Sequence, residues 1–288
     1  MESISTIRST DGDGPGLPGG EPYRLAGATT HFLRSAITGD VYRIDIAIPI
    51  ATAPDGGWPV IFLLDGTGCF ATCVEAMRRM SRRPDATGVV PAVVVGIALQ
   101  AGGEDGIALR RRDFSSARGE EQGTGGADDF LRFILDEVTS HVVGLAPVDM
   151  DRLTLFGHSL AGYFTLWVMA HHPRSFRAYA AISPSIWWDR DGLMAALEAA
   201  DLSAARAMIA IGEWEDALPP WQQAAPGSEK VLARRAARQM VAQAQDMGTY
   251  LQQRLGADRA RFNLLPDEDH ASIISAAIPR MLRLASLD

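Results

Sequence analysis

The amino-acid sequence predicts an α/β fold in which helices cover both faces of a mostly parallel sheet. Short apolar runs rich in β-branched residues indicate strands that are buried on both faces, and such strands are typical of parallel sheets. Helical patterns separate these runs along the whole chain, and this alternation favours a doubly wound layer structure. The buried strands are expected at 59–64, 91–99, 153–156, 178–182, 207–211 and 261–265.

One further strand is expected at 41–48, where apolar and polar residues alternate. Ile44, Ile46 and Ile48 fall on one face and Arg43 and Asp45 on the other, so the pattern predicts a half-exposed strand at a sheet edge.

Helical periodicity and irregular stretches complete the expected layout. Helices are expected around Phe130, Ile134 and Val138, which share one face, and at 160–172, about 228–255 and 271–284. The stretches 100–125 and 214–227 follow predicted strands and are expected to be irregular loops. Loops at the carboxyl ends of parallel strands are where open α/β sheets bind ligands.

Length and composition limit the classes of protein. The 288 residues allow one or two domains, but no repeat or second core is visible, so we expect one domain at 23–288 after a disordered, glycine-rich lead-in at 1–22. The net charge of −8 argues against nucleic-acid and anionic-membrane partners and favours a small molecule, while the oligomeric state stays open.

The location of the protein is predicted from its apolar runs and cysteines. No apolar run approaches the roughly 20 residues that cross a bilayer, and 1–24 contains no segment typical of a signal peptide. Cys69 and Cys73 are spaced poorly for a disulfide and are too few for zinc. We therefore expect a cytoplasmic protein, and no zinc site at these cysteines.

A candidate nucleophile lies between a predicted strand and a predicted helix. Residues 157–162 read Gly-His-Ser-Leu-Ala-Gly, which differs from a G-x-S-x-G string only by Ala161 before Gly162, and alanine still fits a tight turn. Such a string in a strand, turn and helix context is typical of a nucleophile elbow. The strand and helix backbones pass close together at such a turn, which requires small residues around Ser159. The alternative is a serine that only caps a buried helix.

A serine nucleophile needs a base, and the base needs an acid that fixes its tautomer. In this kind of fold both follow the serine, each on a loop after a later strand. His270 is the only histidine after the acid candidates and is therefore the expected base. Glu215 is preferred as the acid over Glu213 and Asp216, which remain alternatives. His158 neighbours the nucleophile and is expected to point elsewhere.

The developing oxyanion needs backbone donors, normally the N–H after the nucleophile and one from the loop after an earlier strand. Leu160 supplies the first. The segment 65–68, Asp-Gly-Thr-Gly, follows a buried strand, and Thr67 is the preferred second donor with Gly66 next.

Six segments and the late His270 resemble the putative esterase family of the α/β-hydrolase superfamily. This family contains siderophore esterases and is related to S-formylglutathione hydrolase. The resemblance runs in order from about Tyr23 to the C-terminus. It rests on segments 63–66, 112–115, 125–131, 157–159, 183–188 and 212–215, which include Arg-Asp-Phe-Ser, Gly-His-Ser, Ser-Pro-Ser-Ile-Trp-Trp and Gly-Glu-Trp-Glu.

The resemblance implies an α/β-hydrolase fold and a serine esterase without a cofactor, with Ser159, Glu215 and His270 as catalytic residues. It also suggests a catecholate siderophore lactone as substrate. Arg112, Arg111 and Trp187 are the expected substrate-binding residues, because siderophores of this kind are polyanionic and arginine binds anions in a bidentate manner. The alternatives are an acyltransferase on the same fold and a non-catalytic binding protein.

Overall fold

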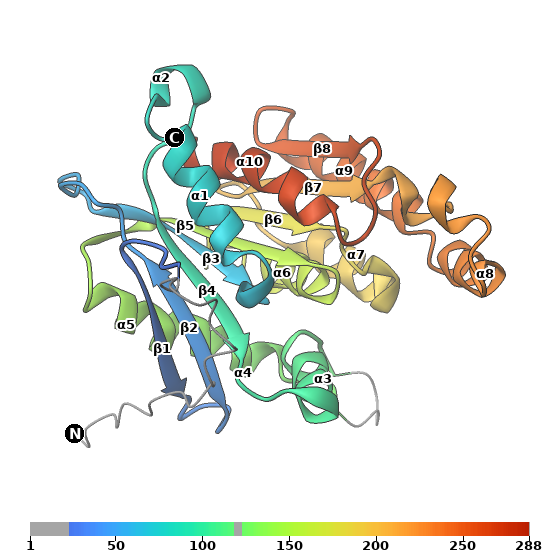
Figure 1. Ribbon diagram of the computed structural model, residues 1–288, viewed down its shortest axis with the longest axis horizontal. Coiled ribbons are helices and arrows are strands. Elements are labelled where there is room, and N and C mark those ends of the chain that lie inside the picture. Colours follow the sequence, from blue (N-terminus) through green and yellow to red (C-terminus); the bar gives the residue numbers. More distant parts are fainter. Residues whose placement is uncertain (1–22, 118–122, 288) are drawn as a thin grey trace, which may run out of the picture.

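The computed structural model describes residues 23–117 and 123–287, which contain an eight-stranded sheet with helices on both faces (Figure 1). The expected lead-in at 1–22 lies outside the described residues. The strands are β1 (Ala28–Arg34), β2 (Val41–Ala47), β3 (Trp58–Leu64), β4 (Val93–Leu99), β5 (Val148–His158), β6 (Ala178–Ile182), β7 (Arg206–Gly212) and β8 (Ala260–Leu265). The helices are α1 (Phe70–Met80), α2 (Pro84–Thr87), α3 (Gly103–Asp113), α4 (Ala127–Arg132), α5 (Thr139–Val143), α6 (Leu160–His171), α7 (Arg190–Ala199), α8 (Ser228–Arg238), α9 (Met240–Leu255) and α10 (Ile273–Ser286).

Strand order and direction bring several loops to the side of the sheet where the parallel strands have their carboxyl ends. The order is β1-β2-β4-β3-β5-β6-β7-β8, and every neighbouring pair from β4 to β8 is parallel, whereas β1 and β2 are antiparallel to their neighbours. The mostly parallel sheet predicted from the sequence is therefore confirmed. The segments that follow β3, β5, β7 and β8 therefore all begin at the same side of the sheet, where these parallel strands have their carboxyl ends.

Alternate residues of the central strands pack into two apolar layers. Phe62 and Leu64 of β3 belong to the layer that includes α6 and α9, whereas Ile61 and Leu63 belong to the layer that includes α1 and α10. Helix α10 contacts β3, β5, β6 and β7, and α1 packs against it and β4. Burial of both strand faces explains the continuous apolar runs in the sequence.

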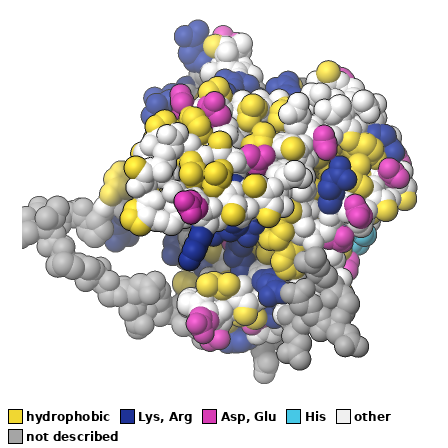
Figure 2. Space-filling view, turned by 90° about the vertical axis from the view of Figure 1, so that its right-hand side faces the viewer, with side chains coloured by type: hydrophobic (Ala, Val, Ile, Leu, Met, Phe, Trp, Pro, Cys, Tyr) yellow, Lys and Arg dark blue, Asp and Glu magenta, His cyan; other side chains and the backbone are white. Residues whose placement is uncertain are grey.

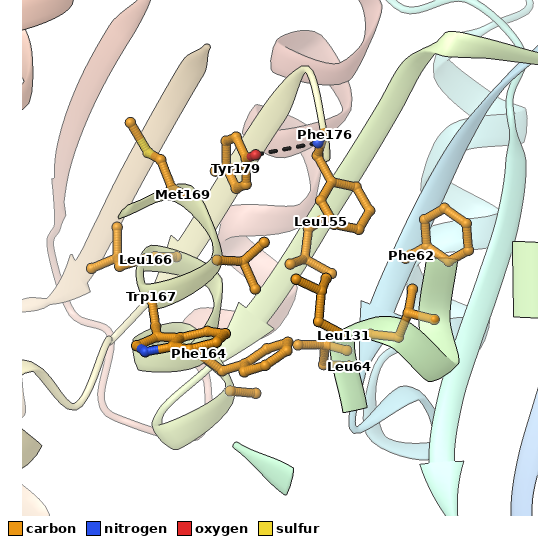
Figure 3. Packing of buried hydrophobic residues seen from close by; sticks show 14 of the residues in the cluster. Phe62, Leu64, Leu131, Leu155, Phe164, Leu166, Trp167, Met169, Phe176 and Tyr179 are labelled. Atoms are coloured by element: carbon orange, nitrogen blue, oxygen red, sulfur yellow. Dashed lines mark hydrogen bonds between the residues drawn. The ribbon is translucent and has the colours of Figure 1, made fainter. Parts of the chain in front are cut away.

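Helix α6, which follows the candidate nucleophile, is apolar on all sides. Every residue from 161 to 170 is buried, because the helix lies between strands β5 and β6 on one side and α7 on the other. Phe164 and Trp167 of α6 face Leu64 and Leu155 of the sheet (Figure 3). Within the described ranges, no helix is both long and apolar enough to cross a membrane.

The expected edge position of the strand at 41–48 is wrong. β1 pairs with β2 along its whole length and forms the edge itself. The pairing buries Asp45, which accepts hydrogen bonds from Thr30 and Arg43 and so keeps polar partners inside the sheet. The β1 sequence, Ala-Thr-Thr-His-Phe-Leu-Arg, lacks a strong apolar alternation, and the strand was not predicted for that reason.

Two further expectations are wrong, namely the irregular loop at 100–125 and the single helix at about 228–255. The stretch 100–125 contains α3 at Gly103–Asp113, whose acidic first turn and three arginines in the last turn complement the helix dipole. The single helix expected at about 228–255 is interrupted at Gln239, which adopts a left-handed conformation with φ 45° between α8 and α9.

A buried carboxylate ties α3 to β2. Asp113 is only 1% exposed and accepts a hydrogen bond of 2.8 Å from the Tyr42 hydroxyl. Arg112 donates to Asp113 at 2.9 Å and to Asp40 at 2.7 Å. Burial raises the pKa of Asp113, and the hydrogen bonds from Arg112 and Tyr42 act against that rise. Arg112 therefore neutralises a carboxylate inside the fold.

We expect Arg112→Ala to lower the free energy of unfolding by about 3 kcal/mol, because it leaves Asp113 buried without its cation. Arg132→Ala is the matched control, since Arg132 pairs with Asp129 at the surface and such pairs contribute about 0.5 kcal/mol. Urea unfolding at pH 7.5 measures both. If both substitutions lowered the free energy of unfolding equally, the proposed stabilising role of Arg112 would be contradicted.

Candidate active site

Ser159 lies at a sharp turn between β5 and α6. Its backbone has φ 60° and ψ −120°, a conformation that costs energy for any residue with a side chain. The turn is held by the Ser159 N–H, which donates to the carbonyl of Ile182 on β6 at 3.0 Å. A Cβ atom at Gly157 would lie 2.1 Å from the carbonyl oxygen of Ala161, so the strand and helix can approach only because residue 157 is glycine. The geometry is that of a nucleophile elbow.

The predicted serine, histidine and glutamate form one hydrogen-bonded row. His270 Nε2 lies 3.1 Å from Ser159 Oγ, and His270 Nδ1 lies 2.6 Å from Glu215 Oε2. Ser159 follows β5, Glu215 follows β7 and His270 follows β8, so parallel strands bring the three residues to the same sheet edge. The two distances are within the reach that proton transfer from a serine to a base requires.

Glu215 is the acid that faces His270, and its surroundings explain why. Its side chain is 1% exposed, and Oε1 accepts hydrogen bonds from the Gly212 N–H at 3.1 Å and from the Ser183 hydroxyl. The two alternatives have other partners. Glu213 accepts from the backbone N–H of Asp267, and Asp216 accepts from the N–H of Val241.

Two serines after β6 contact this row and were not singled out in the sequence. Ser183 adopts φ 45°, donates its N–H to Ala210 on β7 and directs its hydroxyl to Glu215. Ser185 Oγ lies 3.5 Å from Ser159 Oγ and is buried. A left-handed serine at a strand end is a feature of three-dimensional structure, and the sequence pattern does not indicate it.

The loop after β3, residues 65–68, is named the oxyanion loop, because the sequence predicts the second oxyanion donor on it. Asp65 adopts φ 52°, and Gly66–Gly68 form a 3₁₀ turn beside the end of β5, with which β3 pairs. A Cβ at Gly66 would lie 2.5 Å from Gly96 Cα on β4, so glycine is required for this packing. Leu160 begins α6 directly after Ser159. Gly66 and Thr67 lie on this turn and Leu160 on the first turn of α6, and their part as oxyanion donors stays a prediction.

His158 lies against the base, contrary to the expectation that it points elsewhere. The centroids of the His158 and His270 rings are 4.5 Å apart, with an angle of 47° between the ring planes. His158 Nε2 is buried and has no hydrogen-bond partner among the described residues. Burial, together with the neighbouring charge of His270, lowers the pKa of His158 to about 3.

The three consecutive arginines have separate partners. Arg110 makes a bidentate ion pair with Asp65 of the oxyanion loop, its shortest contact being 2.7 Å. The guanidinium of Arg111 lies over the ring of Trp188, 5.4 Å from its centroid. Arg112 is bound to Asp113 and Asp40, as described above.

Aromatic rings and arginines meet close to the site. Trp187 and Trp188 follow Ser185 directly, and their rings are 6.1 Å apart. Arg238, at the end of α8, lies 4.3 Å from the Trp187 ring centroid. Figure 2 shows Lys and Arg side chains gathered in a hollow of the face viewed from the α8 side.

A cavity of about 270 Å³ borders the oxyanion loop. It lies over the carboxyl end of β4, between the loop and α3, and its wall is mostly apolar. The lining includes Thr67, Asp65, Leu99, Ile107, Phe114 and Asp113. Since β4 is separated from β5 only by β3, the cavity lies about 10 Å across the sheet from the strand that carries Ser159.

The sheet, the elbow after β5 and the hydrogen-bonded row define an α/β-hydrolase. Residues 35–262 match the family described as "Putative esterase". The chain therefore belongs to this esterase family, as its segments predicted.

The relatives of the chain include several siderophore esterases. It is 36% identical over 179 residues to the ferri-bacillibactin esterase BesA of Bacillus subtilis, a match that covers 58% of this chain and 62% of that relative. It is 30% identical over 265 residues to the siderophore triacetylfusarinine C esterase of Aspergillus fumigatus, covering 85% and 89%. The crystal structure of the BES protein from Bacillus cereus is 27% identical and superposes with a TM-score of 0.78, covering 95% of this chain and all of that one.

We expect the free energy of unfolding to fall as the pH drops below 6.5, partly because of His158. The unfolded chain takes up a proton on this residue near pH 6.5, whereas the folded chain does not until about pH 3. Between these values the unfolded state binds more protons, so acidification destabilises the fold by about 1.4 kcal/mol per pH unit for one such group. Urea unfolding from pH 7.5 to 5.5 measures the slope. His158→Phe should flatten it, and parallel curves for the two proteins would contradict the assignment.

Proposed function

We propose that the chain hydrolyses carboxylic esters through an acyl-enzyme on Ser159, with His270 as base and acid and Glu215 as the acid that orients His270. The observation that carries the proposal is the uninterrupted row from Glu215 Oε2 through the imidazole to Ser159 Oγ, with distances of 2.6 and 3.1 Å. Each member of the row comes from a different loop, and a row of this kind is what an activated serine requires.

In the first half of the reaction, Ser159 Oγ attacks the ester carbonyl and its proton passes to His270 Nε2. The carbonyl oxygen becomes an oxyanion, which the N–H of Leu160 and that of Thr67, or of Gly66, stabilise. Glu215 stabilises the imidazolium. When the tetrahedral intermediate collapses, the bond to the alcohol oxygen breaks and His270 gives its proton to the departing alcohol.

In the second half, water attacks the acyl-enzyme carbonyl while His270 accepts one of its protons. The bond to Ser159 Oγ then breaks, the serine recovers the proton from His270, and the carboxylic acid leaves. Hydrolysis is favoured over acyl transfer because the chain belongs to an esterase family. Added methanol tests the difference: an acyltransferase would form the methyl ester as its main product.

We infer that the substrate is the ester of an anionic small molecule, in particular a catecholate siderophore lactone. Two matched relatives are named as esterases of siderophores, and arginines lie beside the site in this chain. Arg111 over Trp188 and Arg238 over Trp187 offer a cation next to a flat apolar surface, which suits a charged aromatic group. The guanidinium of Arg112, in contrast, is engaged by Asp113 and Asp40.

We also infer that the protein acts in the cytoplasm. Cys69 and Cys73 are buried free thiols. Cys69 directly follows the oxyanion loop, and Cys73 lies in α1. Buried thiols of this kind are compatible with a reducing compartment.

A fluorophosphonate probe should label wild-type protein on Ser159, and Ser159→Ala should abolish labelling and lower kcat for p-nitrophenyl acetate at least 10³-fold. Glu215→Gln should lower kcat by up to about 10⁴-fold, because the amide no longer stabilises the required tautomer and imidazolium. Glu213→Gln is the matched control, with kcat expected within about two-fold of wild type. Wild-type protein that resists the probe would favour a non-catalytic binding protein.

Arg111→Ala and Arg238→Ala should each raise KM for a ferric catecholate trilactone about five- to tenfold, the loss expected for one charge-assisted contact. KM for neutral p-nitrophenyl acetate should change less than about two-fold. Arg254→Ala serves as control, because Arg254 also lies over a ring, that of Tyr250, but on the outer face of α9. Steady-state kinetics on both esters decide the matter: equal losses on the two would rule out anion recognition by these arginines.

A further inference from the structure

We propose that His158 is a positioning residue, whose ring holds the imidazole of His270 between Glu215 and Ser159. The proposal rests on the proposed function, since it assigns His270 as the base. It concerns the residue directly before the nucleophile, which occupies the second position of the Gly-His-Ser-Leu-Ala-Gly elbow.

The first support is the place of His158 in the sheet. It is the last residue of β5 and pairs with Ile182 of β6, so its backbone is fixed by the centre of the sheet. His270, in contrast, lies on the loop after β8 with a side chain that is 43% exposed. A ring on a rigid strand is thus in contact with a ring on a loop.

The second support is the geometry of the two rings. Their centroids are 4.5 Å apart, within contact distance for aromatic side chains. Glu215 and Ser159 fix the two nitrogen ends of the imidazole, whereas His158 covers one of its faces. Without that cover, the ring could turn away from Ser159 without losing its bond to Glu215.

The third support is that His158 stays uncharged while His270 becomes a cation. Protonation of the buried Nε2 would create an N–H without an acceptor among the described residues. The charged groups that act on His158 are His270 on the loop after β8 and Arg110 on α3, and both oppose a second positive charge. The proton that leaves Ser159 is therefore directed to His270 alone.

Two substitutions separate the ring from its nitrogens. His158→Ala removes the covering ring, whereas His158→Phe keeps an aromatic ring of similar size without the nitrogens. The control is His172→Ala, because His172 pairs with Asp128 at the surface and lies outside the proposed machinery. kcat, KM and the pH dependence of kcat/KM are measured for p-nitrophenyl acetate, with circular dichroism as the check of folding.

We expect His158→Ala to lower kcat about 10- to 100-fold with KM within about three-fold, since the substrate contacts remain. The acid limb of kcat/KM should move to higher pH, because water that replaces the ring solvates the imidazolium of His270. His158→Phe should restore most of kcat and the position of the acid limb. Unchanged kcat and acid limb in His158→Ala, or an equal loss in both variants, would overturn the proposal.

Wild-type protein gives a second measurement in case a variant fails to fold. In NMR spectra, the ring protons of His158 should show an Overhauser contact with those of His270 and should not titrate between pH 8 and 5. A missing contact, or titration of His158 near pH 6.5, would overturn the proposal. Failure of the proposed function gives a different result, because wild-type protein would then neither hydrolyse the ester nor react with the fluorophosphonate.

Discussion

The close approach of β5 and α6 at Ser159 is the constraint on which the rest of the site depends. A serine at φ 60° is held in an unfavourable conformation, and three features sustain it: a glycine at 157, the hydrogen bond from its N–H to Ile182, and a helix that is buried on all sides. Helix α6 cannot shift to relax the turn without exposing apolar side chains. The packing of α6 in the core therefore keeps the Ser159 hydroxyl at the carboxyl end of β5.

A buried carboxylate is costly unless its oxygens have partners, and Glu215 satisfies this condition. One oxygen receives the Gly212 N–H and the Ser183 hydroxyl, and the other faces His270. One face of the His270 ring lies against His158, the last residue of β5, which directly precedes Ser159. His270 is thereby held by the buried Glu215 and by a ring on a central strand, although it lies on a loop itself. This arrangement explains how an exposed loop can present the proposed base in a fixed geometry.

The sequence predicted what depends on strand periodicity and on the position of residues after strands. Five of the six strands expected to be buried are buried, but the burial expected at 261–265 is wrong, because β8 is an edge strand whose residues 261–264 are half-buried or exposed. The convergence of Ser159, Glu215 and His270 follows from parallel strand order, because each lies on the segment after a parallel strand. Features that depend on tertiary contacts were missed. β1 has no apolar alternation, and it is a strand because β2 offers a free edge. The contact of His158 with His270 depends on a side-chain direction that a sequence pattern does not contain.

The three consecutive arginines of α3 contact three different groups. Consecutive residues of a helix point about 100° apart, so Arg110, Arg111 and Arg112 cannot act on one anion together. Arg110 holds the oxyanion loop through Asp65, and Arg112 neutralises the buried Asp113. Only Arg111 is directed to the tryptophans beside the nucleophile. Helix α3 thus contacts the buried Asp113, the oxyanion loop and the proposed substrate-binding surface. A shift of α3 would therefore disturb all three.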